Sequence, residues 1–511
     1  MRFASKATRD MSEPFYLTTA IAYPNGRPHI GHAYEAIAAD VIARFMRAQG
    51  RDVRLVTGTD EHGLKMVQTA RGQDRETLEF ADEMSGHFRV MCDGLDISYD
   101  AFVRTTEERH HAASIALWKA MEANGDLYLD RYEGWYSVRD EAYYDEKELI
   151  AGADGEKLSP QGTPVEWTVE ESWFFKLSDY AERLLAHYRD NPDFIRPESR
   201  RNEIVRFVEG GLKDLSVSRT SFDWGVPVPG SPGHVMYVWV DALTTYMTGV
   251  GYPDDRANYD RFWPADLHLI GKDIVRFHAV YWPAFLMSAK LPLPKQLFGH
   301  GFLLARGEKM SKSLGNVVDP MVLAESYGVD SLRYFLMREV SFGQDGSYSD
   351  EAIVTRCNAE LANSFGNLAQ RTFSMIVKNL DGVVAPAGEA SDDLALLSKV
   401  SEAEGEARAR FAEYDFSAVL EAWMGAVFAA NAYVDAQAPW ALRKTDPARM
   451  AEVLGTLATV VERLGEVVEP VVPKSIARLR SYLGEGRTSG RLAQPQPIFP
   501  RLELVAADES A

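Results

Sequence analysis

The sequence predicts an α/β protein, with a Rossmann-type parallel sheet in its first part, an inserted connective domain and a following α-helical bundle. Three observations lead to this prediction. Strand-like, helical and strand-like patterns follow one another over residues 15–63, which is a βαβ unit. The alternation stops near residue 128 and returns near residue 226. From about residue 350 the pattern is almost wholly helical.

Each element has a local reason. Strand-like β-branched and aromatic residues occupy 15–23, and the helical pattern that follows, 31–49, ends at Gly50. Residues 53–63 form a second strand that ends in a polar loop. Asp319 followed by Pro320 marks a capped helix start. Further strands are expected at 236–242 and 297–305, with a strand and loop at 266–273 and a helix over 274–289. The predicted domains are a catalytic domain in two halves (11–127 and 226–305), the insertion (128–225), a loop region (306–349), the helical domain (350–483) and a surface tail (484–511).

Composition limits the possible functions. The chain has 511 residues, 46% of them hydrophobic and 25% charged, as in soluble globular proteins. No apolar run is long enough to cross a bilayer, so no membrane partner is expected. Two cysteines, Cys92 and Cys357, exclude a disulfide framework and favour a reducing, cytoplasmic location. The formal net charge of −20 argues against non-specific nucleic-acid binding.

The segment YPNGRPHIGHA places His29, Gly31 and His32 where a strand is followed by a helix. Ligands bind beyond the carboxyl ends of parallel strands, and a helix N-terminus there favours anions. Histidines three residues apart share one face of the first turn and can donate hydrogen bonds to phosphate oxygens. Gly31 leaves room for a flat base against the backbone. A plain turn with two surface histidines explains these residues, taken alone, about equally well.

A second motif, RGEKMSKSLGN, follows the last predicted strand and carries Lys309 and Lys312. Two lysines in a Gly-flanked loop suit a phosphate chain that is being transferred, whereas a solvated basic loop is the alternative for the motif alone. The two motifs, in this order and context, resemble those of class I aminoacyl-tRNA synthetases.

From about Phe15 to Leu483 the chain resembles one family of that class, the methionyl-tRNA synthetases. The segments that carry the resemblance are AIAYPNGRPHIGHA, GTDEHG, YEGWYSVRDEAYYDEKEL, EESWFFKL, YVWVDALTTY, LIGKDIVRFHAVYWPA, GEKMSKSLGN and QAPW. The resemblance implies an ATP-dependent methionine–tRNA ligase. Such an enzyme forms methionyl-adenylate and pyrophosphate from L-methionine and ATP with Mg²⁺, then charges initiator and elongator tRNA(Met) at the 3′ end. Positioning and charge stabilisation would supply the catalysis.

The resemblance also implies the site residues. A polarisable thioether packs well on aromatic ring edges, and a buried ammonium needs a carboxylate. The catalytic residues would be His29, His32, Lys309 and Lys312. The ATP site would comprise Gly31, Asp273 at the ribose, Lys309, Met310, Ser311, Lys312 and Ser313. The methionine site would comprise Ala20, Ile21, Tyr23, Asp60, Trp239, Tyr246 and His278. Any one of these aromatics alone would more often be plain core.

Two further regions follow from the resemblance. The helical domain would read the anticodon through Asn367, Arg371 and Trp440, residue types suited to stacking and to base edges. Many members bind structural zinc in the insertion through a Cys-x-x-Cys pair and a second ligand pair. Here Ser137 and Asp140 replace the first pair, and Ser159 stands in the second without a clear partner, so we expect a zinc-free knuckle. Its support would come from the aromatic residues Trp135, Tyr136, Tyr143 and Tyr144. The chain ends before the dimerising module that some members carry, so a monomer is expected.

Other functions fit the sequence less well. Sister enzymes for leucine, isoleucine or valine usually carry a larger editing insertion, and the cysteine enzyme needs a zinc thiolate site. A non-catalytic tRNA binder has no need for either intact motif. A small-molecule nucleotidyltransferase would leave the helical domain unexplained.

Overall fold

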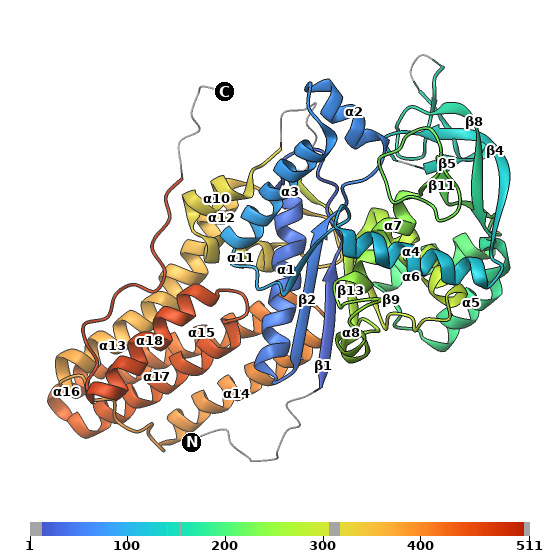
Figure 1. The fold of residues 1–511 in the computed structure, drawn as a ribbon. Helices are drawn as coiled ribbons and strands as arrows, with labels where there is room; N and C mark the ends of the chain where they lie inside the picture. The colour runs from blue at the N-terminus through green and yellow to red at the C-terminus, as the bar shows by residue number, and fades with distance from the viewer. Residues whose placement is uncertain (1–12, 141, 153–154, 306–316, 505–511) are drawn as a thin grey trace. The chain divides into compact units, whose positions relative to one another are not determined.

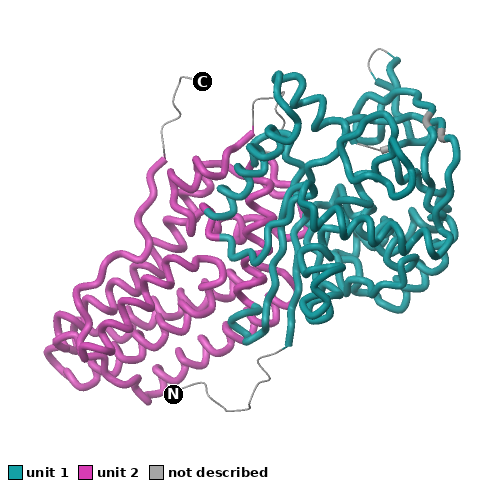
Figure 2. Tube along the Cα trace, in the orientation of Figure 1, with its two compact units in different colours: residues 1–28, 46–93, 97–300 teal, residues 29–45, 94–96, 301–511 magenta. Residues whose placement is uncertain are grey.

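The computed structural model describes residues 13–140, 142–152, 155–305 and 317–504. The chain forms two compact units that are interleaved in sequence (Figure 2). Unit 1 consists of residues 1–28, 46–93 and 97–300, and unit 2 of residues 29–45, 94–96 and 301–511. The predicted loop residues Lys309 to Ser313 lie outside the described residues.

Unit 1 is built on a six-stranded sheet (Figure 1). Its strands are β1 (Pro14–Thr19), β2 (Asp52–Thr59), β3 (Ala101–Arg104), β9 (Ile195–Arg196), β13 (Leu267–Gly271) and β14 (Leu297–His300). The order is β3-β2-β1-β13-β14-β9, and every pairing is parallel. The fold class predicted from the sequence is therefore confirmed. Chain order reverses between β1 and β13, and such a reversal is where ligands bind in sheets of this kind.

Helices surround this sheet and share its core. Trp118, Leu243 and Trp282 are among the fully buried side chains of that core. Burial of a large apolar side chain contributes roughly 1.5–3 kcal/mol, so these residues fix the helices that carry the site. The helical elements are α2 (Leu64–Gly72), α3 (Thr77–Gly94), α4 (Glu108–Ala123), α5 (Ala181–Asp190), α6 (Glu198–Glu209), α7 (Val238–Thr248), α8 (Arg256–Phe262), α9 (Trp282–Ser288), the 3₁₀ turns η2 (Leu177–Tyr180) and η3 (Lys272–Ile274), and the π-helix η4 (Phe277–Tyr281).

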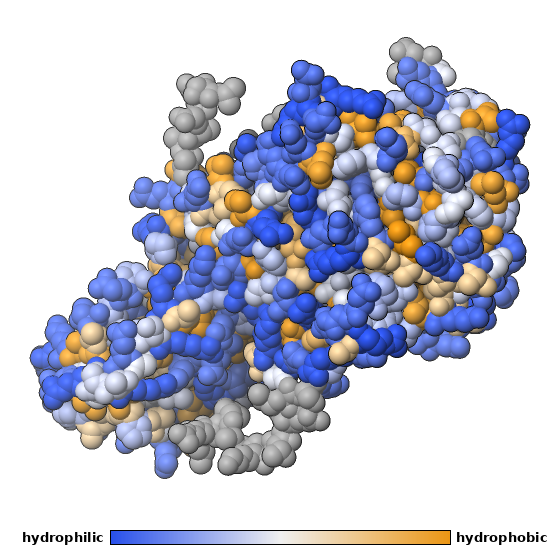
Figure 3. Space-filling model, in the orientation of Figure 1, coloured by the Kyte–Doolittle hydropathy of each residue, from blue (hydrophilic) through white to orange (hydrophobic). Residues whose placement is uncertain are grey.

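The insertion carries a small antiparallel sheet of order β10-β8-β4-β5. Its elements are β4 (Leu127–Ser137), β5 (Ala142–Tyr144), η1 (Glu146–Glu148), β6 (Ile150–Ala151), β7 (Lys157–Leu158), β8 (Glu166–Phe175), β10 (Leu215–Ser216), β11 (Ser218–Arg219) and β12 (Val235–Met236). Its two central strands, β4 and β8, expose Leu129, Trp167 and Val169. On the face drawn in Figure 3, hydrophobic residues are interspersed among hydrophilic ones, as on most folded proteins.

Unit 2 is mainly helical. Its elements are α1 (Ile30–Ala48, whose last turn belongs to unit 1), β15 (Leu303–Ala305), α10 (Pro320–Tyr327), α11 (Val329–Glu339), β16 (Gly346–Tyr348), α12 (Asp350–Cys357), the π-helix η6 (Asn358–Gly366), α13 (Asn367–Asn379), α14 (Ser391–Ala412), α15 (Phe416–Gln437), α16 (Pro439–Thr445), α17 (Pro447–Val468) and α18 (Pro473–Ser489). Side-chain caps set several of the helix starts. Asp319 accepts the backbone N–H of Met321 at 2.8 Å, as the Asp-Pro pair predicts. Ser349 and Asp415 cap α12 and α15 in the same way.

A buried ion pair fixes α1 within unit 2. Asp40 and Arg333 are both 0% exposed, and the Arg333 Nη2 donates to Asp40 Oδ2 at 2.6 Å. The guanidinium also donates to the carbonyls of Leu95, Pro470 and Val471. A charge buried this deeply persists only when it is paired and hydrogen-bonded, so α1, α11 and the start of α18 are tied together by one residue.

Four expectations about individual elements need correction. The segment 236–242 was expected as a strand, but only Val235–Met236 is strand, and helix α7 begins at Val238. The first strand ends at Thr19, not at residue 23. The segment 297–305 contains two strands, β14 and β15. The tail is not a surface segment throughout, because α18 runs to Ser489 and the side chains that follow include four buried ones, Leu492, Ile498, Phe499 and Leu502. Among the described residues, no helix is long and apolar enough to span a membrane.

Candidate active site

The two histidines at the start of α1 form a stacked pair. Their ring centroids are 3.8 Å apart with an interplanar angle of 26°. The His32 Nδ1 accepts the backbone N–H of His29, and the His29 Nδ1 accepts the backbone N–H of Gly31, both at 3.1 Å. A ring nitrogen that accepts a hydrogen bond carries no hydrogen, so each neutral ring carries its hydrogen on Nε2. The pair therefore presents two N–H donors at a helix N-terminus.

Burial lowers the pKa of His32 well below its usual value, and the neighbouring His29 lowers it further. The His32 ring is thus neutral at physiological pH. It can stabilise a phosphate oxygen as a hydrogen-bond donor through Nε2. The backbone N–H groups of Ile30, Gly31 and His32 already donate to the Val318 carbonyl, to His29 Nδ1 and to the His29 carbonyl.

Three aromatic side chains of the predicted methionine site lie together in unit 1. Trp239 and Tyr246 lie on α7, and His278 lies on the π-helix η4. The Trp239 ring is edge-on to His278 at 6.0 Å, and the Tyr246 hydroxyl is 2.6 Å from His278 Nε2. The His278 Nδ1 donates to the carbonyl of Ile274 at 2.9 Å, so Nε2 is the acceptor of the Tyr246 hydroxyl.

Phe277 completes this aromatic cluster. Its ring stacks on Trp239 with centroids 3.9 Å apart and planes 5° from parallel. A π-helix places consecutive side chains differently from an α-helix, and such turns are frequent at functional sites. Phe277 was missed because no pattern in the sequence reveals a π-helix.

The polar residues of the site follow the carboxyl ends of β2 and β13, the two strands that flank β1. The backbone N–H of Asp60, just after β2, donates to the carbonyl of Ala22 at 2.8 Å, which places Asp60 beside the segment that follows β1. Asp273 follows β13 and is exposed. A Cβ at Gly271 would lie 2.7 Å from Asp273 Oδ1, so a larger residue there would displace this carboxylate.

The other predicted methionine-site residues are Ala20, Ile21 and Tyr23, and their surroundings differ from one another. Ala20 packs against the main core, and its N–H donates to the carbonyl of Leu269 in the middle of β13. Tyr23 packs instead on the smaller apolar cluster that includes Met66 and Phe80 of α2 and α3. Ile21 is half-buried.

Comparison with known proteins decides the family. The family model described as tRNA synthetases class I (M) matches residues 15–373. The chain belongs to the class I methionyl-tRNA synthetases. A methionine–tRNA ligase of Brucella suis biovar 1 is 57% identical over 512 residues, which cover 97% of this chain and 99% of the relative. One of Rhizobium meliloti is 56% identical, with 96% and 99% covered.

Solved structures of the same family share the fold. A Mycobacterium tuberculosis methionyl-tRNA synthetase in complex with methionyl-adenylate has a TM-score of 0.93 and 54% identity, with 96% of this chain and 100% of that chain covered. The apo form of that synthetase has a TM-score of 0.86 and 51% identity, with 96% and 99% covered. The activity of the family is that of a methionine–tRNA ligase.

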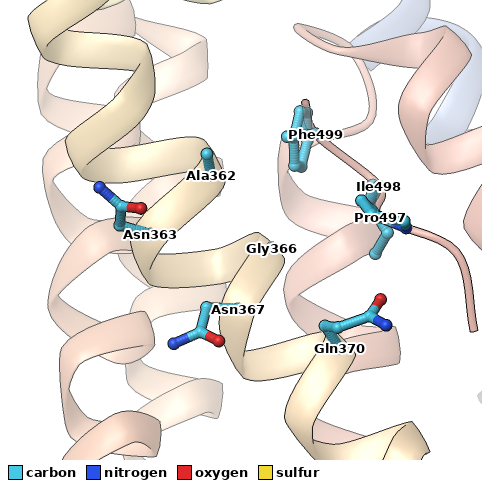
Figure 4. A pocket seen from close by; sticks show the side chains of 8 residues that line it. All are labelled: Ala362, Asn363, Gly366, Asn367, Gln370, Pro497, Ile498 and Phe499. Atoms are coloured by element: carbon cyan, nitrogen blue, oxygen red, sulfur yellow. The ribbon is translucent and has the colours of Figure 1, made fainter. Parts of the chain in front are cut away.

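The synthetase's predicted anticodon residues lie on the helices of unit 2. The Arg371 guanidinium is 5.9 Å from the centre of the Trp440 ring, which is 52% exposed, and 3.4 Å from the Asp435 carboxylate. Asn367, one turn before Arg371, is exposed at the rim of a groove. Figure 4 shows that groove between the helix that carries Asn363, Asn367 and Gln370 and the tail segment 497–499.

The insertion of the synthetase holds a buried polar cluster where the zinc ligands of relatives were expected to be replaced. The Asp140 carboxylate accepts hydrogen bonds from Ser159 Oγ at 2.5 Å, Thr163 Oγ1 at 2.6 Å and the Tyr144 hydroxyl at 3.0 Å. Ser137 Oγ lies 2.7 Å from Thr163 Oγ1. Thr163 is thus the partner of Ser159 that the sequence did not reveal, because it lies four residues on and not three. Across the described part of the chain, no group of three His, Cys, Asp or Glu side chains is arranged to hold a metal ion.

The lowered pKa of His278 should make a measurable contribution to the pH dependence of the protein's stability. Burial lowers its pKa to about 4, so between about pH 6.5 and pH 4 the unfolded chain binds a proton that the folded chain does not. Stability therefore falls as the pH falls, by about 2 kcal/mol from this residue between pH 7 and pH 5. Denaturant unfolding at both pH values should show a smaller loss for His278→Gln, which cannot titrate. Equal losses in the two proteins would contradict the assignment.

Proposed function

We propose that this chain, working as a monomer in the cytoplasm, activates L-methionine with ATP and transfers the methionyl group to tRNA(Met). The methionine carboxylate attacks the α-phosphate of ATP, the bond to the β-phosphate breaks, and pyrophosphate leaves. The terminal ribose hydroxyl of tRNA(Met) then attacks the carbonyl of the adenylate, and AMP leaves. The stacked histidine pair at the start of α1 is the observation that carries this proposal.

The phosphate chain is assigned to residues of complementary chemistry. His29 and His32 donate Nε2 hydrogens to phosphate oxygens, with Gly31 leaving space for the base. Lys309 and Lys312, in the segment Lys309–Ser313, take the pyrophosphate charge, and Asp273 takes the ribose hydroxyls. Mg²⁺ in such reactions binds mainly to substrate phosphates and water and neutralises developing charge.

Methionine is assigned to residues that follow the carboxyl ends of β1 and β2 and to the aromatic cluster of α7 and η4. Asp60 accepts the ammonium, and the Trp239–Tyr246–His278 cluster takes the thioether, with Ala20, Ile21 and Tyr23 as the remaining walls. Neutral aromatic rings suit sulfur better than a charged group does, and the lowered pKa of His278 keeps its ring neutral.

The test is exchange of labelled pyrophosphate into ATP, without tRNA, across the standard amino acids. Exchange with methionine alone is expected. Exchange with another amino acid would keep the reaction and overturn the methionine site. No exchange with any amino acid, in a folded protein with Mg²⁺, would favour a tRNA-binding relative without catalysis.

Asn367, Arg371 and Trp440 are proposed to read the anticodon. Trp440→Ala is expected to raise the KM for tRNA(Met) about 10- to 100-fold, because stacking on one base is worth roughly 1–3 kcal/mol. Pyrophosphate exchange should not change, since it needs no tRNA. Phe428→Ala is the matched control, an aromatic 59% exposed elsewhere on the helices. Equal charging kinetics for both variants would refute the role of Trp440.

The insertion is proposed to hold its shape without zinc through the Asp140 cluster. Treatment with a chelator should leave the apparent Tm unchanged. Asp140→Ala should lower the free energy of unfolding of the insertion by about 2–3 kcal/mol, because it leaves buried hydroxyl groups without their hydrogen-bond acceptor. Asp130→Ala, an exposed aspartate on β4, is the control. Differential scanning calorimetry distinguishes these cases, and a Tm that falls on chelation would disprove the zinc-free knuckle.

A further inference from the structure

A buried carboxylate joins helix α7 to the loop after β2. Asp241 is 0% exposed. Its Oδ2 is 2.5 Å from His62 Nδ1, and its Oδ1 is 2.6 Å from His110 Nε2. Burial raises the pKa of Asp241, but the attraction of His62 and the hydrogen bonds from both histidines outweigh it and hold the pKa well below its usual range. An ionised carboxylate only accepts, so both histidines donate to it.

The loop that carries His62 is fixed at several points besides this one. The backbone N–H of Glu61 donates to Thr105 Oγ1 at 2.9 Å, and the Trp224 indole donates to the Glu61 carbonyl at 2.6 Å. His62 lies two residues after Asp60 in the same loop. Its ring is edge-on to Trp224, 5.5 Å between centroids. Asp60 and His62 therefore belong to one tightly held loop, and the bond between His62 and Asp241 links that loop to α7.

The carboxylate itself is held from the opposite side. The second ring nitrogen of His110 is 2.9 Å from Thr248 Oγ1, at the end of α7. His110 is hydrogen-bonded to both Asp241 and Thr248. It therefore fixes the orientation of the Asp241 carboxylate, with Oδ2 directed at His62. A side chain held by packing and by a second hydrogen bond can position its partner accurately.

The contact connects the two groups that bind the two ends of methionine. Asp60 is proposed to take the ammonium, whereas Trp239 and Tyr246, on the same helix as Asp241, line the thioether site. We propose that His62 and Asp241 are positioning residues that set the separation between these two groups, and thereby the side-chain length that the enzyme accepts. This inference rests on the proposed function. A plain buried ion pair would stabilise the fold and would have no effect on the choice of amino acid.

Asp241→Asn tests the proposal through discrimination between methionine and ethionine, which is longer by one methylene. The amide cannot accept from both histidines, so the loop and α7 lose their fixed separation. We expect the ratio of kcat/KM for methionine to that for ethionine, in pyrophosphate exchange, to fall about tenfold, since one methylene is worth about 10- to 200-fold in a tight site. The KM for methionine should rise, and the KM for ATP should not change.

Asp393→Asn is the control for stability alone, because Asp393 is another fully buried carboxylate, paired with Arg449 in the helical unit. It should lower the Tm and leave the ratio unchanged. His62→Asn keeps a donor at the Nδ1 position and should retain the ratio, whereas His62→Leu should lose it. The two His62 variants test the positioning role if Asp241→Asn fails to fold.

Two results would overturn the inference. One is an unchanged ratio in both Asp241→Asn and His62→Leu, whatever the loss of stability. The other is an equal change in Asp393→Asn. An unmodified protein without methionine-dependent exchange would instead overturn the proposed function, and the inference with it.

Discussion

Replacement of His32 by asparagine is expected to slow methionine-dependent pyrophosphate exchange by about 100- to 1,000-fold in kcat, the usual cost of losing one transition-state donor. The asparagine carbonyl can still accept the His29 N–H that the His32 Nδ1 accepts at 3.1 Å, so the first turn of α1 stays intact. Only the Nε2 donor is lost. Steady-state exchange kinetics measure the effect, and the KM for methionine should change little.

Two variants separate the donor from the fold. His32→Gln extends its amide toward the former Nε2 position and should recover part of the rate. His87→Asn changes a histidine on α3 to which no role in the site is assigned, and should have the rate and the Tm of the unmodified protein. If His32→Asn retained most of its exchange activity, the assignment of the histidine pair to the phosphates would fail.

Replacement of Asp40 by asparagine should produce a large loss of stability. It leaves the Arg333 guanidinium buried without its carboxylate, and breaking such a pair costs about 3–5 kcal/mol. The apparent Tm of the helical unit should fall on the order of 10 °C. Circular dichroism at 222 nm follows this transition, because the unit is mainly helical.

Glu339→Gln provides the comparison for an ion pair near the surface. Glu339 pairs with Arg356 at 2.6 Å, and both side chains are one-third exposed. A pair of this kind contributes about 0–1 kcal/mol. If Asp40→Asn destabilised the protein no more than Glu339→Gln, the buried pair would not be what fixes α1. The double variant Asp40→Leu/Arg333→Met should recover much of the loss, since no unpaired charge remains.

The sequence revealed those parts of the fold that depend on local patterns. Alternation of strand and helix predicted the parallel sheet, and the Asp319–Pro320 pair predicted the start of α10. Helix α7 was mistaken for a strand because its run of apolar and β-branched residues is buried on nearly all sides, where periodicity cannot distinguish helix from strand. The single Asp241 within that run was the available signal, since a buried carboxylate implies partners from other elements.

The candidate site, like the fold, was predictable only where it depends on local sequence patterns. His29 and His32 are close in sequence and share one turn, so their spacing alone predicted a shared face. The Trp239–His278 cluster depended on resemblance, because no local pattern brings α7 beside η4. Thr163 and Phe277 could not be found, since one requires the course of a loop and the other a π-helix.

The interleaving of the two units has a consequence for synthesis on the ribosome. Residues 29–45, which carry both histidines, belong to a unit whose remainder is residues 94–96 and 301–511. The roughly 250 residues in between take on the order of 10–50 s to translate. During that time the first helix has no Arg333 to pair with Asp40. The first helix is therefore synthesised early, but its ion pair with Arg333 can form only after residue 333 has been translated. A nascent chain halted before residue 333 should expose this helix to proteases and chaperones.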